Sequence, residues 1–102
     1  MNRAPRIVDP TDTQDLVLLM EFETNQVTVF ARDPDGDALN FVWITPPGAV
    51  VQTVDGDSDA LQYSTLSLVR APDLHGRNIR LAVDDGESEV FVDWTIQMPG
   101  AN

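Results

Sequence analysis

The alternation of apolar and polar residues is the feature of this sequence that most constrains its fold. Over most of the chain every second residue is apolar, which matches a β-strand, where side chains point in turn to opposite faces. No window of about 11 residues holds a helical apolar stripe, so the pattern predicts an all-β protein. The clearest core-facing sets are Val27, Val29 and Ala31; Leu39, Phe41 and Trp43; Ile79, Leu81 and Val83; and Val90, Val92, Trp94, Ile96 and Met98.

Short segments rich in Gly, Pro, Asp and Asn separate these runs and predict turns. The expected turns are residues 24–26, 33–37, 46–48, 55–59, 72–76 and 84–86. The expected strands are residues 5–9, 15–23, 26–33, 38–45, 49–54, 60–69, 78–84 and 88–98. The run 15–23 could also start a helix, but its short length and β neighbours favour a strand. About seven to eight antiparallel strands, with Trp43 on the third main strand, predict an immunoglobulin-like β-sandwich.

Length and composition fit a single globular domain. The chain has 102 residues, so we expect one domain over 1–102, with linker ends at 1–6 and 99–102. Because 42% of the residues are hydrophobic, the chain is not a disordered acidic tail. The sequence has no cysteine, which excludes a disulfide scaffold, a cysteine-based zinc finger and a thiol nucleophile. No stretch reaches the roughly 18 apolar residues of a membrane helix.

The charge of the chain is strongly negative. Asp and Glu number 17 against 6 basic residues, all of them Arg, for a net charge of −11. Nucleic-acid binding is excluded because phosphate contacts require clustered cations. An anionic membrane surface is excluded as a partner for the same reason.

Residues 31–43, A-R-D-P-D-G-D-A-L-N-F-V-W, resemble the A-x-D-P-D-G-D-x-L-x-Y-x-W stretch of bacterial PKD-like and cadherin-like immunoglobulin-fold modules. Residues 2–5 resemble the opening of such a module, and residues 83–86 with 90–96 resemble its closing hairpin. The resemblance covers nearly the whole chain, although residues 44–47 depart from the stricter PKD pattern. It implies a module, often one of a tandem series, of secreted, lipid-anchored or cell-surface bacterial proteins. Such modules serve as spacers, adhesive units or calcium-stiffened rods.

Following the direction of the expected strands places three acid-rich loops at one end of the sandwich, near the start of the first strand. Calcium takes six to eight oxygen ligands in flexible geometry, so these loops are candidate calcium ligands. An EF-hand is excluded, since neither Ile44 nor Leu66 is the glutamate required at position 12. The alternative is that the acids only form turns. The candidates are Asp33, Asp35, Asp37, Asp84 and Asp85, with Asp55, Asp57 and Asp59 weaker and Glu87 nearby.

No catalytic set is recognisable in the sequence, so we expect a non-enzymatic protein. His75 is the single histidine and is interpreted as a surface or corner-packing residue, without a nucleophile and an orienting acid. Ser64 and Ser67 lie on an expected strand without a G-x-S-x-G elbow. A glycosidase needs two acids across a cleft, and the acids here crowd turns. Apart from calcium, no cofactor is expected.

Four large apolar residues have the parity opposite to the core, namely Phe30, Val42, Ile44 and Phe91. They could form a patch for a partner or a neighbouring module. The interpretation we favour from sequence alone is that they are scattered surface residues or are covered by an edge segment.

These observations predict a non-catalytic module for adhesion, protein interaction or spacing. Its partners are expected to be a protein or neighbouring immunoglobulin-like domains. The expected location is extracytoplasmic, in the periplasm, in an outer-membrane lipoprotein or at the cell surface, and cytoplasmic if Met1 is the native start. One alternative is a small partner-binding lipoprotein or assembly component, and another is an ancillary carbohydrate-binding domain of a secreted hydrolase.

Overall fold

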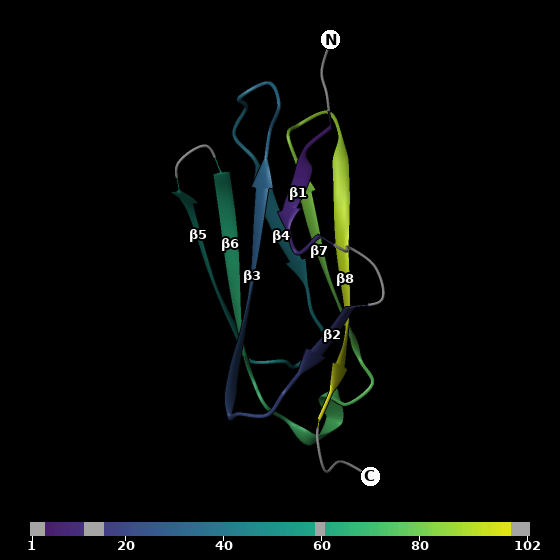
Figure 1. Ribbon diagram of the computed structural model, residues 1–102. Helices are drawn as coiled ribbons and strands as arrows, with labels where there is room; N and C mark the ends of the chain where they lie inside the picture. The colour runs from purple at the N-terminus through teal and green to yellow at the C-terminus, as the bar shows by residue number, and fades with distance from the viewer. Residues whose placement is uncertain (1–3, 12–15, 59–60, 99–102) are drawn as a thin grey trace.

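The protein is a two-layered β-structure in a computed structural model that describes residues 4–11, 16–58 and 61–98 (Figure 1). Across these ranges the chain forms eight strands and one short 3-10 helix. The elements are β1 (Arg6–Asp9), β2 (Leu16–Leu19), β3 (Thr24–Arg32), β4 (Asn40–Ile44), β5 (Val51–Ser58), β6 (Leu61–Val69), η1 (Pro72–Leu74), β7 (Asn78–Asp84) and β8 (Glu89–Gln97).

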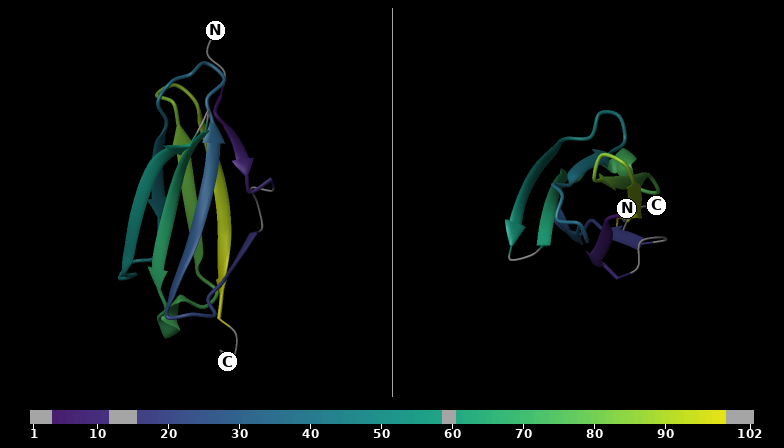
Figure 2. Two further views of the ribbon diagram at one scale, coloured as in Figure 1. Left: turned by 60° about the vertical axis from the view of Figure 1, so that its left-hand side comes forward. Right: turned by 90° about the horizontal axis from the view of Figure 1, so that it is seen from above.

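The strands form two four-stranded sheets that face each other (Figure 2). One sheet has the order β1-β3-β6-β5 and the other the order β2-β8-β7-β4. The predicted all-β sandwich is therefore confirmed. Its pairings are antiparallel as expected, except that β2 runs parallel to β8, with Leu16 beside Trp94. The parallel pair arises because the chain passes from the first sheet, at β1, to the second, at β2, without reversing direction.

The core lies between the sheets and is built from the alternating apolar residues. Val29, Leu66, Leu81 and Val92 are fully buried, each on a different strand. Trp43 of β4 is half-buried and stacks on Trp94 of β8, with 5.5 Å between the ring centroids. In antibody-type domains the tryptophan of this strand packs against a disulfide. This chain has no cysteine, and Trp43 packs against the indole of Trp94 instead of a disulfide.

Several predicted boundaries were wrong. The segment 55–59 was expected to be a turn, but β5 continues to Ser58, so that Asp55 and Asp57 lie on a paired strand. The expected turn at 24–26 is the first part of β3, and the bend comes earlier, at 22–23. The expected strand 15–23 is shorter, since β2 covers Leu16–Leu19, whereas β1 lies within the expected strand 5–9. Asp59 and residues 99–102 lie outside the described residues.

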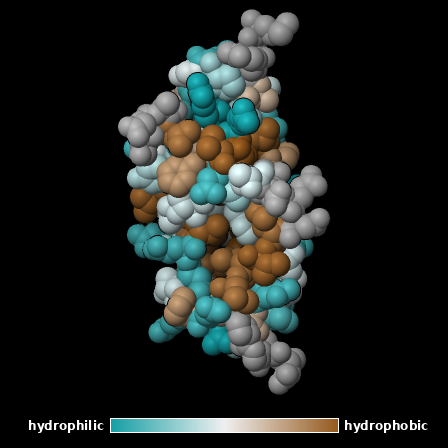
Figure 3. All heavy atoms as spheres, in the orientation of Figure 1, coloured by the Kyte–Doolittle hydropathy of each residue, from teal (hydrophilic) through white to brown (hydrophobic). Residues whose placement is uncertain are grey.

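The molecule is elongated, with principal extents of 50 × 23 × 21 Å. β1 begins at the end that carries the 33–37 loop, and β8 ends at the opposite end (Figure 1). On the face that Figure 3 shows, hydrophilic side chains lie near the first end, and a band of apolar side chains lies next to them. We call the first end the acidic end. None of the helices in the described ranges is long and apolar enough to cross a membrane.

Candidate metal site

Asp33 is a buried carboxylate at the upper end of β3. The side chains of Val29 and Ala31 point into the core, and Asp33 continues this parity, which explains why it is only 7% exposed. Its Oδ1 accepts the Asp35 N–H at 2.7 Å, and its carbonyl oxygen accepts the Gly36 N–H at 3.0 Å. Gly36 has φ +80°, a backbone conformation that glycine adopts without strain. The loop therefore turns sharply around a carboxylate that points inward.

The second carboxylate oxygen of Asp33, Oδ2, is buried and has no hydrogen-bond partner among the described residues. One carboxylate oxygen each from Asp33, Asp35 and Asp37 lie within 4.8 Å of one another. Leaving a buried acceptor without a partner costs roughly 1–3 kcal/mol, and more when the group is charged. Three carboxylates at this spacing also repel one another. The loop is therefore arranged in a way that a bound cation would stabilise.

Gln62 of β6 holds the second half of this loop, residues 37–39, by two hydrogen bonds. This contact was not predicted from the sequence. Its Oε1 accepts the Leu39 N–H at 2.8 Å, and its Nε2 donates to the Asp37 carbonyl at 3.0 Å. Gln62 has the parity of Ser64 and Leu66, which are buried. A polar residue in a core-facing position was the sequence signal that could have identified it.

Asp57 adds a fourth carboxylate near the cluster. It lies on β5 opposite Gln62 and lines, together with Asp33 and Asp37, an open hollow of about 400 Å³. The expectation that the 55–59 segment shares the acidic end with the 33–37 loop is thus fulfilled for Asp57, although from a strand.

Asp55 is engaged elsewhere. It accepts a hydrogen bond from the hydroxyl of Ser64, and Ser64 Oγ in turn accepts the Trp43 indole N–H at 2.8 Å. Ser64 is fully buried, so this relay from β5 through β6 to β4 joins the two sheets. Asp55 is an exposed residue that serves as the acceptor for this buried serine, and it is not part of the Asp33, Asp35 and Asp37 cluster.

Asp84 and Asp85 lie at the same end of the molecule but outside the cluster (Figure 1). Asp84 Oδ1 accepts the Gly86 N–H at 3.0 Å. Asp85 Oδ1 accepts the N–H groups of Glu87 at 2.9 Å and Ser88 at 2.8 Å. These are the local bonds by which Asp residues close turns. Asp84 Oδ1 also accepts a bond from the Asn40 side chain on β4 at 3.4 Å, so this carboxylate both closes the turn and links two strands.

His75 lies in the corner between β6 and β7, as the sequence suggested. Its Nδ1 accepts the N–H of Met98 at 3.1 Å, which ties the corner to the end of β8. The main chain adds a second link, since the Gly76 N–H donates to the Ile96 carbonyl at 2.9 Å. The histidine therefore fastens two segments that are distant in sequence.

The sheet orders, the stacked tryptophan on β4 and the corner before β7 define an immunoglobulin-like β-sandwich. Among solved structures, the fold is similar to a chimeric titin Z1Z2 functionalized with a KLER exogenous peptide from decorin. The TM-score is 0.55, with 15% sequence identity, covering 96% of each chain. No family model matches the sequence. No curated protein matches it either.

Proposed function

We propose that this chain is a non-catalytic immunoglobulin-like module that spaces or joins protein partners outside the cytoplasm, and that calcium stiffens its acidic end. The fold supports the general role, because such sandwiches commonly present surfaces and loops to other proteins. The extracytoplasmic location rests on the resemblance of residues 31–43 to bacterial surface modules. The two other candidates, a lipoprotein component and a carbohydrate-binding domain, stay predictions without a structural observation in their favour.

The observation that carries the calcium proposal is the buried, unpartnered Oδ2 of Asp33 beside the carboxylates of Asp35 and Asp37. The donor set consists of hard oxygens, which suit calcium, and calcium accepts the irregular geometry that a loop offers. Asp57 lines the same hollow as Asp33 and Asp37, so its carboxylate is a further candidate ligand. When bound, the ion neutralises part of the local charge and holds the loop to the end of β3.

This arrangement also supports the spacing role. β1 begins at the acidic end, so a module preceding this one in a tandem would meet it beside the proposed ion. A module following it would start at the far end, where β8 finishes. An ion that stiffens the loop would then limit bending at one junction of the series.

The test is thermal unfolding during a calcium titration, in a buffer of about 0.15 M salt that screens general charge effects. If the dissociation constant is about 1 mM, typical of extracellular modules, calcium at about 10 mM stabilises by about 1.4 kcal/mol. That corresponds to a rise of roughly 5–10 °C in Tm for a domain of this size. Magnesium should give a smaller shift, because it requires near-octahedral geometry.

The matched variants are Asp33→Asn and Asp73→Asn. Both remove one carboxylate, but Asp73 lies in η1, at the opposite end of the molecule. The calcium-induced rise in Tm should disappear in Asp33→Asn and persist in Asp73→Asn. An equal rise in both variants, or none in the unmodified chain, would contradict the proposed site.

A further inference from the structure

The two sheets have four edge strands, and three of them carry features that discourage pairing with another chain. β1 and β2 have only four residues each, and the register of β1 is also irregular between Ile7 and Asp9. β4 has five residues, and Pro46 and Pro47 follow it closely. Short length, bulges and prolines keep a sheet edge from acquiring a further strand. β5 is different, because it is an edge strand of eight residues on the outer side of its sheet (Figure 1).

The side chains of β5 are exposed on both faces of the strand. Val51 and Thr53 lie opposite the buried residues Leu68 and Leu66 of β6, so they point to the same face of the sheet as the core. Both are nevertheless exposed, which means that the other sheet does not cover β5. Val54, on the outer face, is 55% exposed. β5 therefore offers an edge and two faces to a partner.

The hydrogen bonds between β5 and β6 show which backbone groups of β5 point toward the open edge. The Val69 N–H donates to the carbonyl of Val50, which lies opposite it, at 3.0 Å. Hydrogen-bonded and non-hydrogen-bonded pairs alternate along an antiparallel ladder. The N–H and C=O groups of the alternate residues Val51, Thr53 and Asp55 therefore point away from β6. These residues recur about every 6.8 Å along the edge.

We infer that the open edge of β5 binds an extended segment of a partner protein, which adds to the sheet as an antiparallel strand. A strand carries N–H and C=O groups at the same repeat as Val51, Thr53 and Asp55, so it can bond to all three residues. Opposite charges directly across a strand pair are stabilising, so the segment carries Lys or Arg opposite the exposed Asp55. Val51 and Val54 favour β-branched or aromatic residues opposite them. The inference rests on the joining role proposed above and is independent of calcium.

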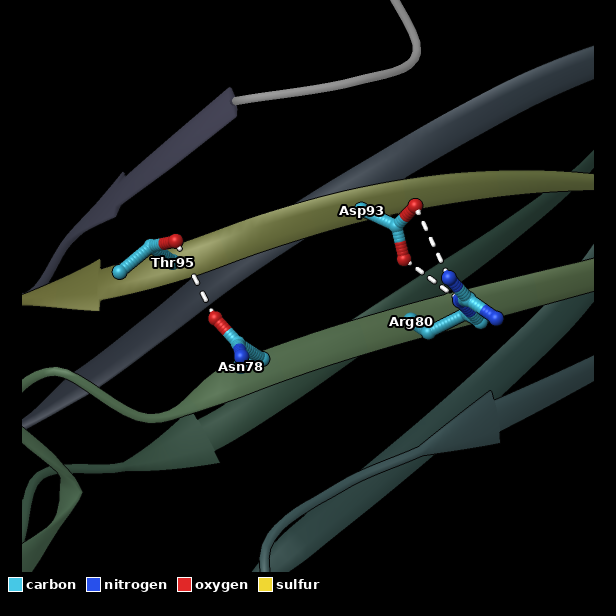
Figure 4. A network of polar contacts seen from close by, with 4 residues as sticks. All are labelled: Asn78, Arg80, Asp93 and Thr95. Carbon is cyan, nitrogen blue, oxygen red and sulfur yellow. Dashed lines mark hydrogen bonds and ion pairs between the residues drawn. The ribbon is translucent and has the colours of Figure 1, made fainter.

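A second copy of this chain does not supply the same chemistry. β5 contains no basic residue, so a second β5 cannot place a cation opposite Asp55. Of the six arginines, Arg80 is already held by Asp93 on the neighbouring strand, with 2.6 Å between Nε and Oδ1 (Figure 4). The hydrogen bond and the charge of Asp93 raise the pKa of Arg80. Two chains that each carry a net charge of −11 also repel one another. A basic segment of another protein is therefore the occupant that fits the edge.

The probe is a synthetic octapeptide, acetyl-Lys-Thr-Lys-Val-Thr-Thr-Val-Val-amide, designed to lie antiparallel to β5 with its third residue opposite Asp55 and its fifth opposite Thr53. In EDTA and about 0.15 M salt, calorimetry should give a dissociation constant on the order of 100 µM, because one added strand is a small interface. Methylating the backbone nitrogen of the fifth residue, which faces β5, should weaken binding about tenfold. Methylating that of the fourth residue, which faces away, should leave the affinity unchanged. The two methylated peptides have the same charge, so general attraction to the acidic end affects them equally.

Amide hydrogen exchange locates the bound peptide. At about 1 mM peptide, exchange at Val51, Thr53 and Asp55 should slow about tenfold. Exchange at Gln52 and Val54 should change little, because their N–H groups face β6. Equal weakening by the two methylations, protection of the other set of amides, or no binding at about 1 mM overturns the inference. Such a failure leaves the calcium-induced rise in Tm untouched, so it is distinguishable from failure of the proposed metal site.

A charge added to β5 gives a matched pair of variants. Val54→Lys should weaken peptide binding about fivefold, because it removes an apolar cross-strand contact and adds a charge that repels the peptide. Ile44→Lys adds the same charge to β4, at a residue that is 53% exposed, and should leave binding unchanged. Without peptide, sedimentation velocity at about 0.3 mM should show a monomer. A dimer that Val54→Lys prevents would identify a second copy as the occupant of the edge and overturn the inference.

Discussion

The side chain of Asp33 lies at a position that the alternating pattern of β3 assigns to the core. β3 presents Val29 and Ala31 to the interior, and Asp33 follows in phase. Burial without a partner for Oδ2 is an unfavourable arrangement unless another charge compensates it. The buried, unpartnered Oδ2 of Asp33 destabilises the loop when no cation is bound. The same oxygen would be a ligand for a bound cation, which is why Asp33 is central to the proposed function.

We predict that the effect of Asp33→Asn on the free energy of unfolding changes sign between EDTA and calcium. In EDTA the variant should be more stable than the unmodified chain by about 0.5–2 kcal/mol, since it removes a buried charge and retains the Oδ1 acceptor for the Asp35 N–H. In about 10 mM calcium the unmodified chain should be the more stable of the two. Urea unfolding under both conditions measures the difference. The same order of stability with and without calcium would contradict the role given to Asp33.

The polar relay through Ser64 leads to a second prediction at the level of single residues. Ser64→Ala removes the acceptor of the Trp43 indole N–H and the donor to Asp55 within a fully buried position. The expected loss is about 1–3 kcal/mol in the free energy of unfolding. Urea unfolding followed by tryptophan fluorescence reports both the stability and the environment of Trp43. Ser67→Ala, on the outer side of the same strand, should cost less than about 0.5 kcal/mol.

At the scale of elements, the alternating pattern was sufficient to locate eight strands and to assign most core residues. It failed at β5, because Asp55, Gly56 and Asp57 have turn propensities that pairing with β6 overrides. Gly56 is required in that strand by a neighbour: a Cβ atom there would lie 2.5 Å from the Tyr63 hydroxyl. Cross-strand contacts of this kind have no local sequence signal.

The candidate metal site could be predicted from the sequence only in part, because some of its contacts join distant strands. Asp33, Asp35 and Asp37 adjoin in the sequence, so their grouping follows from a single loop. The separation of Asp84 and Asp85 from that group, and the brace from Gln62, depend on how strands from both sheets meet. The parity of Asp33 was visible in the sequence, and it is the signal that would have distinguished this acid from ordinary turn residues.

β5 is also a free edge of its sheet, and this leads to a prediction about aggregation. Residues 49–54, A-V-V-Q-T-V, are uncharged and rich in β-branched side chains, and Val51 and Val54 are exposed. Charged residues on an edge strand discourage pairing with other chains. Asp57→Ser should therefore speed aggregation several-fold on heating in EDTA, as measured by light scattering. Asp73→Ser removes the same charge at the other end, and equal rates for both variants would contradict an edge-specific effect.

At the scale of the whole molecule, the net charge of −11 is distributed unevenly. The acidic end holds the cluster of Asp33, Asp35 and Asp37, whereas Arg80 on β7 and Asp93 on β8 form an ion pair.

Because like charges repel across the whole surface, added salt should stabilise this protein even without calcium. In EDTA, raising sodium chloride from about 0.01 M to about 0.5 M should increase Tm by several degrees, equivalent to about 1 kcal/mol, as the screening length falls to about 4 Å. Differential scanning calorimetry measures this baseline. A calcium-induced rise that persists at the higher salt then reports binding at the Asp33 loop, because general screening is already complete. A Tm that is constant or falls with sodium chloride would show that the 17 acids are locally compensated, and that the −11 charge does not weaken the fold.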